Sequence, residues 1–75
     1  MKVKTRFGER IRKLREEAGI NQPQFAQALE VKTATINRYE NDIREPEYAT
    51  LIKIADYFNV SVDYLLGRTE NRKRL

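Results

Sequence analysis

The sequence predicts a single all-α domain of five helices. Apolar residues recur at spacings of three and four along most of the 75 residues, which is the period of an α-helix. Residues that begin or end helices separate these segments, and no segment shows a strand pattern, a repeat or low complexity. A chain of this length forms one domain with a small core, so we expect only modest stability.

The first helix is predicted over residues 5–18. Its apolar stripe, at spacings of four, three and four, consists of Phe7, Ile11, Leu14 and Ala18. Thr5 supplies a side chain that can cap the first turn, and Gly19 suits the left-handed conformation that ends many helices. We expect a flexible basic arm at residues 1–5, followed by a folded domain over residues 6–67.

The segment 22–40 predicts two short helices joined by a three-residue turn. Asn21 can cap the first of them, and Pro23 falls within its first turn, where a missing N–H is harmless. The inward-facing residues at helical spacing are Phe25, Ala26, Leu29, Ile36 and Tyr39. Because Ala26 is small, the second helix can cross close over the first. This is the pattern of a helix-turn-helix.

The C-terminal half predicts two further helices. A helix over residues 47–58 follows a loop that ends at Pro46. The apolar face of this helix consists of Leu51, Ile54, Ala55 and Phe58. Ser61 can cap a last short helix over residues 62–66. The remaining residues, 68–75, form a basic tail that we expect to be disordered.

The outward face of the second short helix lacks the residues of an ordinary solvated surface. The side chains that point away from the core are Thr33, Ala34, Asn37, Arg38 and Asn41. None is acidic and none is large and apolar, whereas hydrogen-bonding groups and small methyls suit base edges in a DNA major groove. A helix over residues 33–41 is about 13 Å long, close to the roughly 12 Å width of that groove.

Composition excludes several classes of function. The chain has no cysteine and no histidine, which removes disulfides, thiolate catalysis and the usual zinc ligands, so we expect no metal and no cofactor. Asp56 and Asp63 lack a partner for acid–base chemistry, and Glu16 and Glu17 point to different sides of one helix, which argues against an enzyme. No apolar run approaches the ~20 residues that span a bilayer, and we expect a cytoplasmic protein.

The net charge of +4 is unevenly distributed along the chain. The first 15 residues are strongly basic, with Glu9 as their one acid, and the tail is basic again. Basic ends around a near-neutral middle suit a polyanionic partner. These charges can equally be solvated, and Arg10, Arg12 and Lys13 point to different sides of a helix. The charge therefore supports nucleic-acid binding only together with the motif.

Five motifs occur in a characteristic order and spacing: FGERIRKLREEAGINQ, FAQAL, TINRYEN, REP and LIKIADYFNVSVDYLLG. They lie within residues Arg6 to Gly67, which is nearly the whole chain. On these residues the chain resembles the phage-repressor-like helix-turn-helix family, the Cro/C1 and Xre type. The resemblance implies a compact five-helix domain, similar to that of lambda repressor, that binds double-stranded operator DNA. It also implies a repressor that acts as a homodimer on a palindrome.

The resemblance implies roles for individual residues. Base contacts are expected from Thr33, Ala34, Asn37 and Arg38. Phosphate contacts are expected from Gln22, Lys32, Asn41 and Arg44. Gln22 can alternatively brace the base-reading side chains. Arg15 and Glu40 match a buried ion pair that ties the first helix to the third, which is a structural role.

Two residues depart from the family pattern. Glu30 stands where the turn usually has glycine, at a position of positive φ that costs a non-glycine residue on the order of 1 kcal/mol. We expect its carboxylate to point sideways, away from phosphate. Lys32 stands where a Ser or Thr cap would be better, so the start of the recognition helix is expected to be weakly capped.

Several assignments have alternatives. Arg38 can grip a guanine or reach a phosphate, and Asn37 can pair with adenine or remain solvated. Tyr57 and Tyr64 can complete the margin of the core or help form a dimer surface. A dimer contact is expected from Val62, Tyr64 and Leu65. The same fold can instead serve as an antitoxin-like or regulatory module whose partner is a protein.

Overall fold

The computed structural model describes residues 5–74, and these residues form five helices and no strand. The helices are α1 (Phe7–Glu17), α2 (Gln22–Leu29), α3 (Thr33–Glu40), α4 (Tyr48–Phe58) and α5 (Val62–Leu65). The all-α prediction and the order of its five helices are therefore confirmed. Apart from Thr5, the basic arm predicted at residues 1–5 lies outside the described residues.

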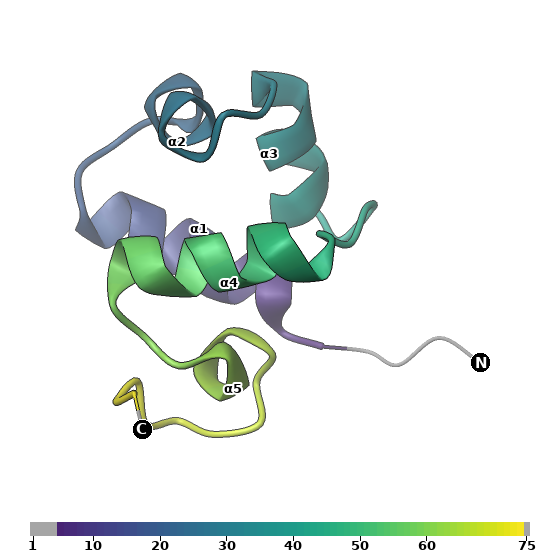
Figure 1. Ribbon diagram of the computed structural model, residues 1–75. Coiled ribbons are helices and arrows are strands. Elements are labelled where there is room, and N and C mark those ends of the chain that lie inside the picture. The colour runs from purple at the N-terminus through teal and green to yellow at the C-terminus, as the bar shows by residue number, and fades with distance from the viewer. Residues whose placement is uncertain (1–4, 75) are drawn as a thin grey trace.

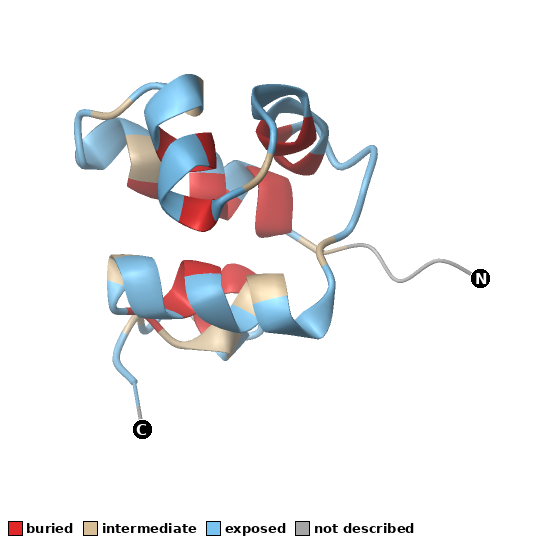
Figure 2. Ribbon diagram, turned by 45° about the horizontal axis from the view of Figure 1, so that its top comes forward, coloured by how far each residue is buried: buried red, intermediate tan, exposed pale blue. Residues whose placement is uncertain are grey.

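The helices surround one core (Figure 1). In this view α2 and α3 lie above the pair formed by α1 and α4, and α5 lies below that pair with the C-terminal segment. Each helix contributes one fully buried apolar side chain, and together these are Ile11, Phe25, Ile36, Ile54 and Leu65. Figure 2 shows the buried residues on the faces that the helices turn toward one another. This shared core fixes how α2 and α3 are oriented on the rest of the domain.

Most residues of the predicted apolar faces are buried, but Leu51 and Phe58 are half-buried and Ala18 is exposed. Ala18 is exposed because α1 ends at Glu17 and Ala18 is only its C-cap. Tyr64 is buried, whereas Tyr57 is exposed at one edge while its ring centroid lies 5.9 Å from that of Phe25. Both tyrosines thus belong to the core or its margin.

The residues expected to form a dimer contact around α5 are mostly buried inside the domain. Tyr64 and Leu65 are buried inside the domain, and Val62 is half-buried against the same core. Two of the three expected contact residues are therefore inaccessible to a second copy unless α5 moves.

Side-chain caps mark where α2 and α5 begin. Asn21 accepts a hydrogen bond from the Gln24 N–H at 2.8 Å, and the Gln24 side chain accepts one from the Asn21 N–H at 2.8 Å, which forms a complete capping box. Ser61 accepts from the Tyr64 N–H at 3.0 Å and caps α5 as predicted. Thr5 accepts from the Phe7 N–H at 3.3 Å, but α1 begins at Phe7 rather than at residue 5.

A close approach joins the start of α1 to the end of α3. The Gly8 N–H donates to the Asp42 Oδ1 at 3.1 Å, and Asp42 has a φ of 57° just after the helix. A Cβ atom at Gly8 would lie 2.6 Å from the Glu40 carbonyl oxygen and 2.7 Å from that of Tyr39. Only glycine therefore lets the two backbones come this close.

The C-terminal segment differs from the expected disordered tail. The Ser61 N–H donates to the Arg72 carbonyl at 3.0 Å, which holds residues 68–74 beside α5. The Arg72 guanidinium makes a two-pronged bond to Glu17 at 2.8 and 2.9 Å, and Arg74 pairs with Asp56. Basic composition alone indicated a free polar tail, but opposite charges on α1 and α4 provide it with partners.

Replacing Gly8 by alanine should destabilise the domain by about 1–3 kcal/mol, because the new methyl group collides with the end of α3. An alanine normally stabilises a helix interior relative to glycine, so the expected sign is opposite to helix propensity. Urea denaturation measures the change. Gly19→Ala is the control, since nothing lies within 4 Å of its Cβ and only the positive φ is strained. An unchanged stability of Gly8→Ala would contradict the close approach.

Replacing Arg72 by glutamine should raise the pKa of Glu17 toward its ordinary value of 4.5. The hydrogen bond from Arg72, opposed by partial burial and aided by the charges of Arg72 and Lys13, lowers this pKa in the folded chain. The associated stability is present above the ordinary pKa and is lost as pH falls through the lower folded value. Carboxyl titration by NMR measures the shift. Glu9, whose pKa is lowered chiefly by Arg6, should titrate unchanged.

Candidate nucleic-acid interface

The four predicted base-contacting residues lie together on one exposed face of α3. Thr33, Ala34, Asn37 and Arg38 are all exposed. The opposite face of the same helix is buried and consists of Thr35, Ile36, Tyr39 and Glu40. An eight-residue helix thus has one side committed to the core and one side open to a partner. The structure confirms this placement, while the base contacts themselves remain a prediction.

The turn between α2 and α3 is tight despite its lack of glycine. Glu30 has a φ of 59° and ends α2 in the left-handed conformation. The Val31 N–H donates to the Ala26 carbonyl at 3.0 Å, and the Val31 side chain packs against the core. The Glu30 carboxylate lies 3.6 Å from the Lys53 ammonium group on α4. The carboxylate therefore points toward α4, sideways as expected.

The start and end of α3 present polar groups without competing acids. Lys32 is the N-cap of α3 and makes no side-chain cap, as its chemistry predicts. Among the described residues, no carboxylate lies within ion-pair distance of Lys32, Arg38 or Arg44, and all three are exposed. The Asn41 side chain donates to the Asn37 carbonyl at 2.8 Å and so closes the helix. The cations near α3 are free to meet an external anion.

Gln22 lies at the start of α2 and reaches toward α3. Its Nε2 donates to the Glu40 Oε1 at 3.1 Å, and the residue is half-buried. This contact corresponds to the bracing role that was the alternative to phosphate binding. The predicted phosphate contact of Gln22 is not tested by this geometry and stays a prediction.

The Glu40 carboxylate joins three helices in one buried network. Arg15 of α1 donates to both of its oxygens, at 2.6 and 3.1 Å, and Gln22 of α2 donates to one of them. The side chains of Arg15 and Glu40 are only 12% and 2% exposed. The hydrogen bond to Glu40 raises the pKa of Arg15 although burial opposes it. The expected ion pair between α1 and α3 is present.

Among the described residues, no group of three or more carboxylate, histidine or cysteine side chains could hold a metal ion. The described helices also include none that is long and apolar enough to cross a membrane.

Two buried polar residues were missed by the sequence reasoning. Thr35 is buried beside Ile36, and Arg10 is buried on the α5 side of α1. Arg10 follows Phe7 by three residues and precedes Leu14 by four, so its helical position on the apolar stripe was a signal of burial that its charge concealed.

A family model described as Helix-turn-helix, HTH_3, matches residues 11–65. The chain belongs to this helix-turn-helix family, of the Cro/C1 type. Its match includes α2, the turn and α3 as well as the core residues of α4 and α5.

This helix-turn-helix chain is similar to named transcriptional regulators. It is 39% identical over 68 residues to the HTH-type transcriptional regulator ImmR of Bacillus subtilis, covering 91% of this chain and 54% of ImmR. It is 35% identical over 69 residues to RamB of Mycobacterium tuberculosis, covering 92% of this chain and 15% of RamB. The chain thus spans about half the length of the first relative and a small part of the second.

Solved structures of helix-turn-helix proteins share the fold. A transcriptional regulator from Listeria innocua superposes with a TM-score of 0.80 at 33% identity, covering 85% of this chain and 60% of that one. The P22 c2 repressor in complex with a synthetic operator superposes with a TM-score of 0.76 at 32% identity, covering 80% of this chain and 91% of that one. The expected similarity to phage repressors is confirmed.

Replacing Glu40 by glutamine should destabilise the domain by about 3–5 kcal/mol, because Arg15 would remain buried without its counter-ion. Chemical denaturation measures the change. Glu16→Gln is the matched control, since it breaks an exposed pair with Arg12 and should cost less than about 1 kcal/mol.

If Glu40→Gln does not fold, a second variant keeps the test decisive. Adding Arg15→Met to Glu40→Gln removes the stranded charge and should recover part of the lost stability. Equal losses for Glu40→Gln and Glu16→Gln would contradict the importance of the buried network.

Proposed function

We propose that the chain binds double-stranded DNA in a sequence-specific manner, with α3 in the major groove. The observation that supports this most directly is the exposed face of α3, which offers hydrogen-bonding groups and methyls and no carboxylate. The buried network behind it holds α3 rigidly on α1 and α2. The relatives named as transcriptional regulators, and a similar repressor solved with a synthetic operator, support the same function.

Four residues of α3 are proposed to read base edges. The methyl groups of Thr33 and Ala34 suit the methyl group of thymine, the Asn37 amide suits adenine, and the Arg38 guanidinium suits guanine. All four lie on the same exposed face. A well-placed bidentate contact discriminates against a wrong base by about 1–3 kcal/mol.

The surrounding polar residues are proposed to contact phosphate. They are Gln22, Lys32, Asn41 and Arg44, which lie at the ends of α2 and α3 and in the loop after α3. Such contacts orient the helix on the duplex without reading its sequence. The Gln22 amide nitrogen carries two N–H donors. One donates to Glu40 and braces α3, and the other is proposed to contact phosphate.

We further propose a repressor that acts as a homodimer on a palindromic operator in the cytoplasm. The support is the similarity to phage repressors, because two symmetric copies read two half-sites about one helical turn apart. Tyr64 and Leu65 are buried, so a second copy needs another surface. Ile52 of α4 and Val62 of α5 border an open pocket of about 450 Å³ that residues of the C-terminal segment between 69 and 74 also line.

Selection from a random duplex library should enrich one palindromic site, and its affinity should fall steeply with salt. The log–log slope is expected to change by about 0.9 for each phosphate contact removed. Arg38→Ala should relax the preference at one base position. Arg44→Ala should weaken binding evenly across sequences and reduce the salt slope. Fluorescence anisotropy at several salt concentrations measures both effects.

Arg74→Ala is the control for these variants, since it removes the same charge from the C-terminal segment, where Arg74 pairs with Asp56. Its affinity for DNA should match that of the unaltered chain. If no duplex is enriched, or if a stable protein partner covers α3 instead, the DNA-binding proposal is wrong and the protein-interaction module replaces it.

A further inference from the structure

We propose that a pocket between α1, α5 and the C-terminal segment binds a phosphate group of a small molecule. This α1–α5 pocket has a volume of about 380 Å³. Its cationic lining residues are Arg6, Arg10, Lys13 and Arg72. The inference does not depend on DNA binding, because it concerns a different surface of the domain.

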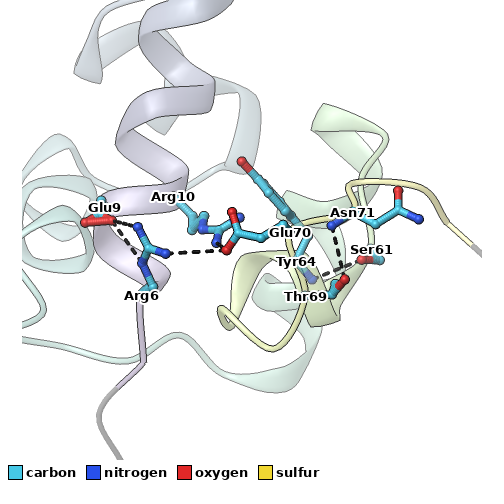
Figure 3. A network of polar contacts seen from close by, with 8 residues as sticks. All are labelled: Arg6, Glu9, Arg10, Ser61, Tyr64, Thr69, Glu70 and Asn71. Carbon is cyan, nitrogen blue, oxygen red and sulfur yellow. Dashed lines mark hydrogen bonds and ion pairs between the residues drawn. The ribbon is translucent and has the colours of Figure 1, made fainter.

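Arg10 is the central group of the α1–α5 pocket. Its side chain is only 5% exposed, and its guanidinium carbon lies 4.2 Å from the centroid of the Tyr64 ring. A buried cation is costly unless an anion and hydrogen-bond acceptors satisfy it. The anion present is the carboxylate of Glu70, whose Oε2 lies 2.6 Å from the Arg10 Nη2. Figure 3 shows Arg6 and Arg10 reaching from α1 toward this carboxylate.

The Glu70 carboxylate occupies the position in the pocket that an external anion would take. Its side chain is 83% exposed, although its partner is buried, and the same oxygen lies 3.5 Å from the Arg6 Nη1. It lies in the C-terminal segment, where no helix holds it. Because the Glu70 side chain is mostly exposed, it can rotate into solvent while Arg72 keeps the segment docked, and an external anion that takes its place keeps the buried Arg10 paired.

The charges around the pocket favour an anion stronger than one carboxylate. Arg72 is paired with Glu17 and Arg6 is paired with Glu9. Arg10 and Lys13 therefore face Glu70 as the remaining acid of the lining, which leaves an excess of one positive charge. A phosphate group carries up to two negative charges and three or more acceptor oxygens, and it suits guanidinium donors.

The α1–α5 pocket lies on the side of α1 that is remote from α3. Successive residues turn by about 100° around a helix, so Arg6, Arg10 and Lys13 form one stripe. Gly8 and Arg15, which contact the end of α3, lie on the opposite side of α1. A duplex bound along α3 would not reach the pocket. The ligand is therefore free phosphate or a small phosphate ester, and not the DNA backbone.

Removing the acid of the pocket and removing one of its cations should change the affinity for phosphate in opposite directions. Isothermal titration of the full chain with inorganic phosphate, and separately with glucose 6-phosphate, is made at constant ionic strength in chloride. Glu70→Gln removes the internal competitor and should tighten binding about tenfold, whereas Lys13→Gln should weaken it about threefold. Arg12→Gln is the matched control, because Arg12 lies on α1 outside the pocket and should leave the affinity unchanged.

The outcomes separate a site from general charge screening. Binding of both ligands indicates a phosphate ester, and binding of inorganic phosphate alone indicates the free ion; either result supports the pocket. Equal weakening by Lys13→Gln and Arg12→Gln, or no tightening in Glu70→Gln, would overturn it. Competition by a short duplex for the same site would also overturn it. Circular dichroism confirms that each variant is folded.

Discussion

The Glu40 carboxylate is the interaction on which the arrangement of α1, α2 and α3 depends. It accepts hydrogen bonds from Arg15 and from Gln22 in a place that water hardly reaches. A buried charge tolerates little displacement of its partners, because each lost bond leaves an unsatisfied group in a region of low dielectric constant. The exposed face of α3 therefore keeps one orientation relative to α1, which is what reading a groove requires.

The start of α1 is fixed to α3 by close packing rather than by charge. Helix α3 contains three β-branched residues within its first four, so its own propensity is weak and packing must stabilise it. The approach of Gly8 to the last carbonyls of α3, together with the bond to Asp42, closes the helix against α1. Close packing at Gly8 and charge at Arg15 thus act at two different points along α1, and both hold the C-terminal end of α3.

The helices were predictable from the sequence because each has an apolar stripe and recognisable end residues. The inward positions of Phe25, Leu29 and Ile36 follow from spacing alone, and so does the outward face of α3. The burial of Arg10 was concealed by its charge, although the residue lies on the apolar stripe of α1, and the docking of residues 68–74 was not predictable because it depends on pairs far apart in sequence. A charged residue is usually exposed. It is buried only where a partner distant in the sequence pairs with it in the folded chain.

The exposed face of α3 and the α1–α5 pocket lie on opposite sides of α1. This separation limits how a ligand at one can influence the other. An anion that occupies the α1–α5 pocket binds only the folded chain, so it stabilises the domain in proportion to its concentration. It does not change which side chains α3 exposes, because Arg15 and Gln22 continue to hold Glu40 on the other side. Such a ligand would alter how much folded protein is present, and the sequence that α3 reads would stay the same.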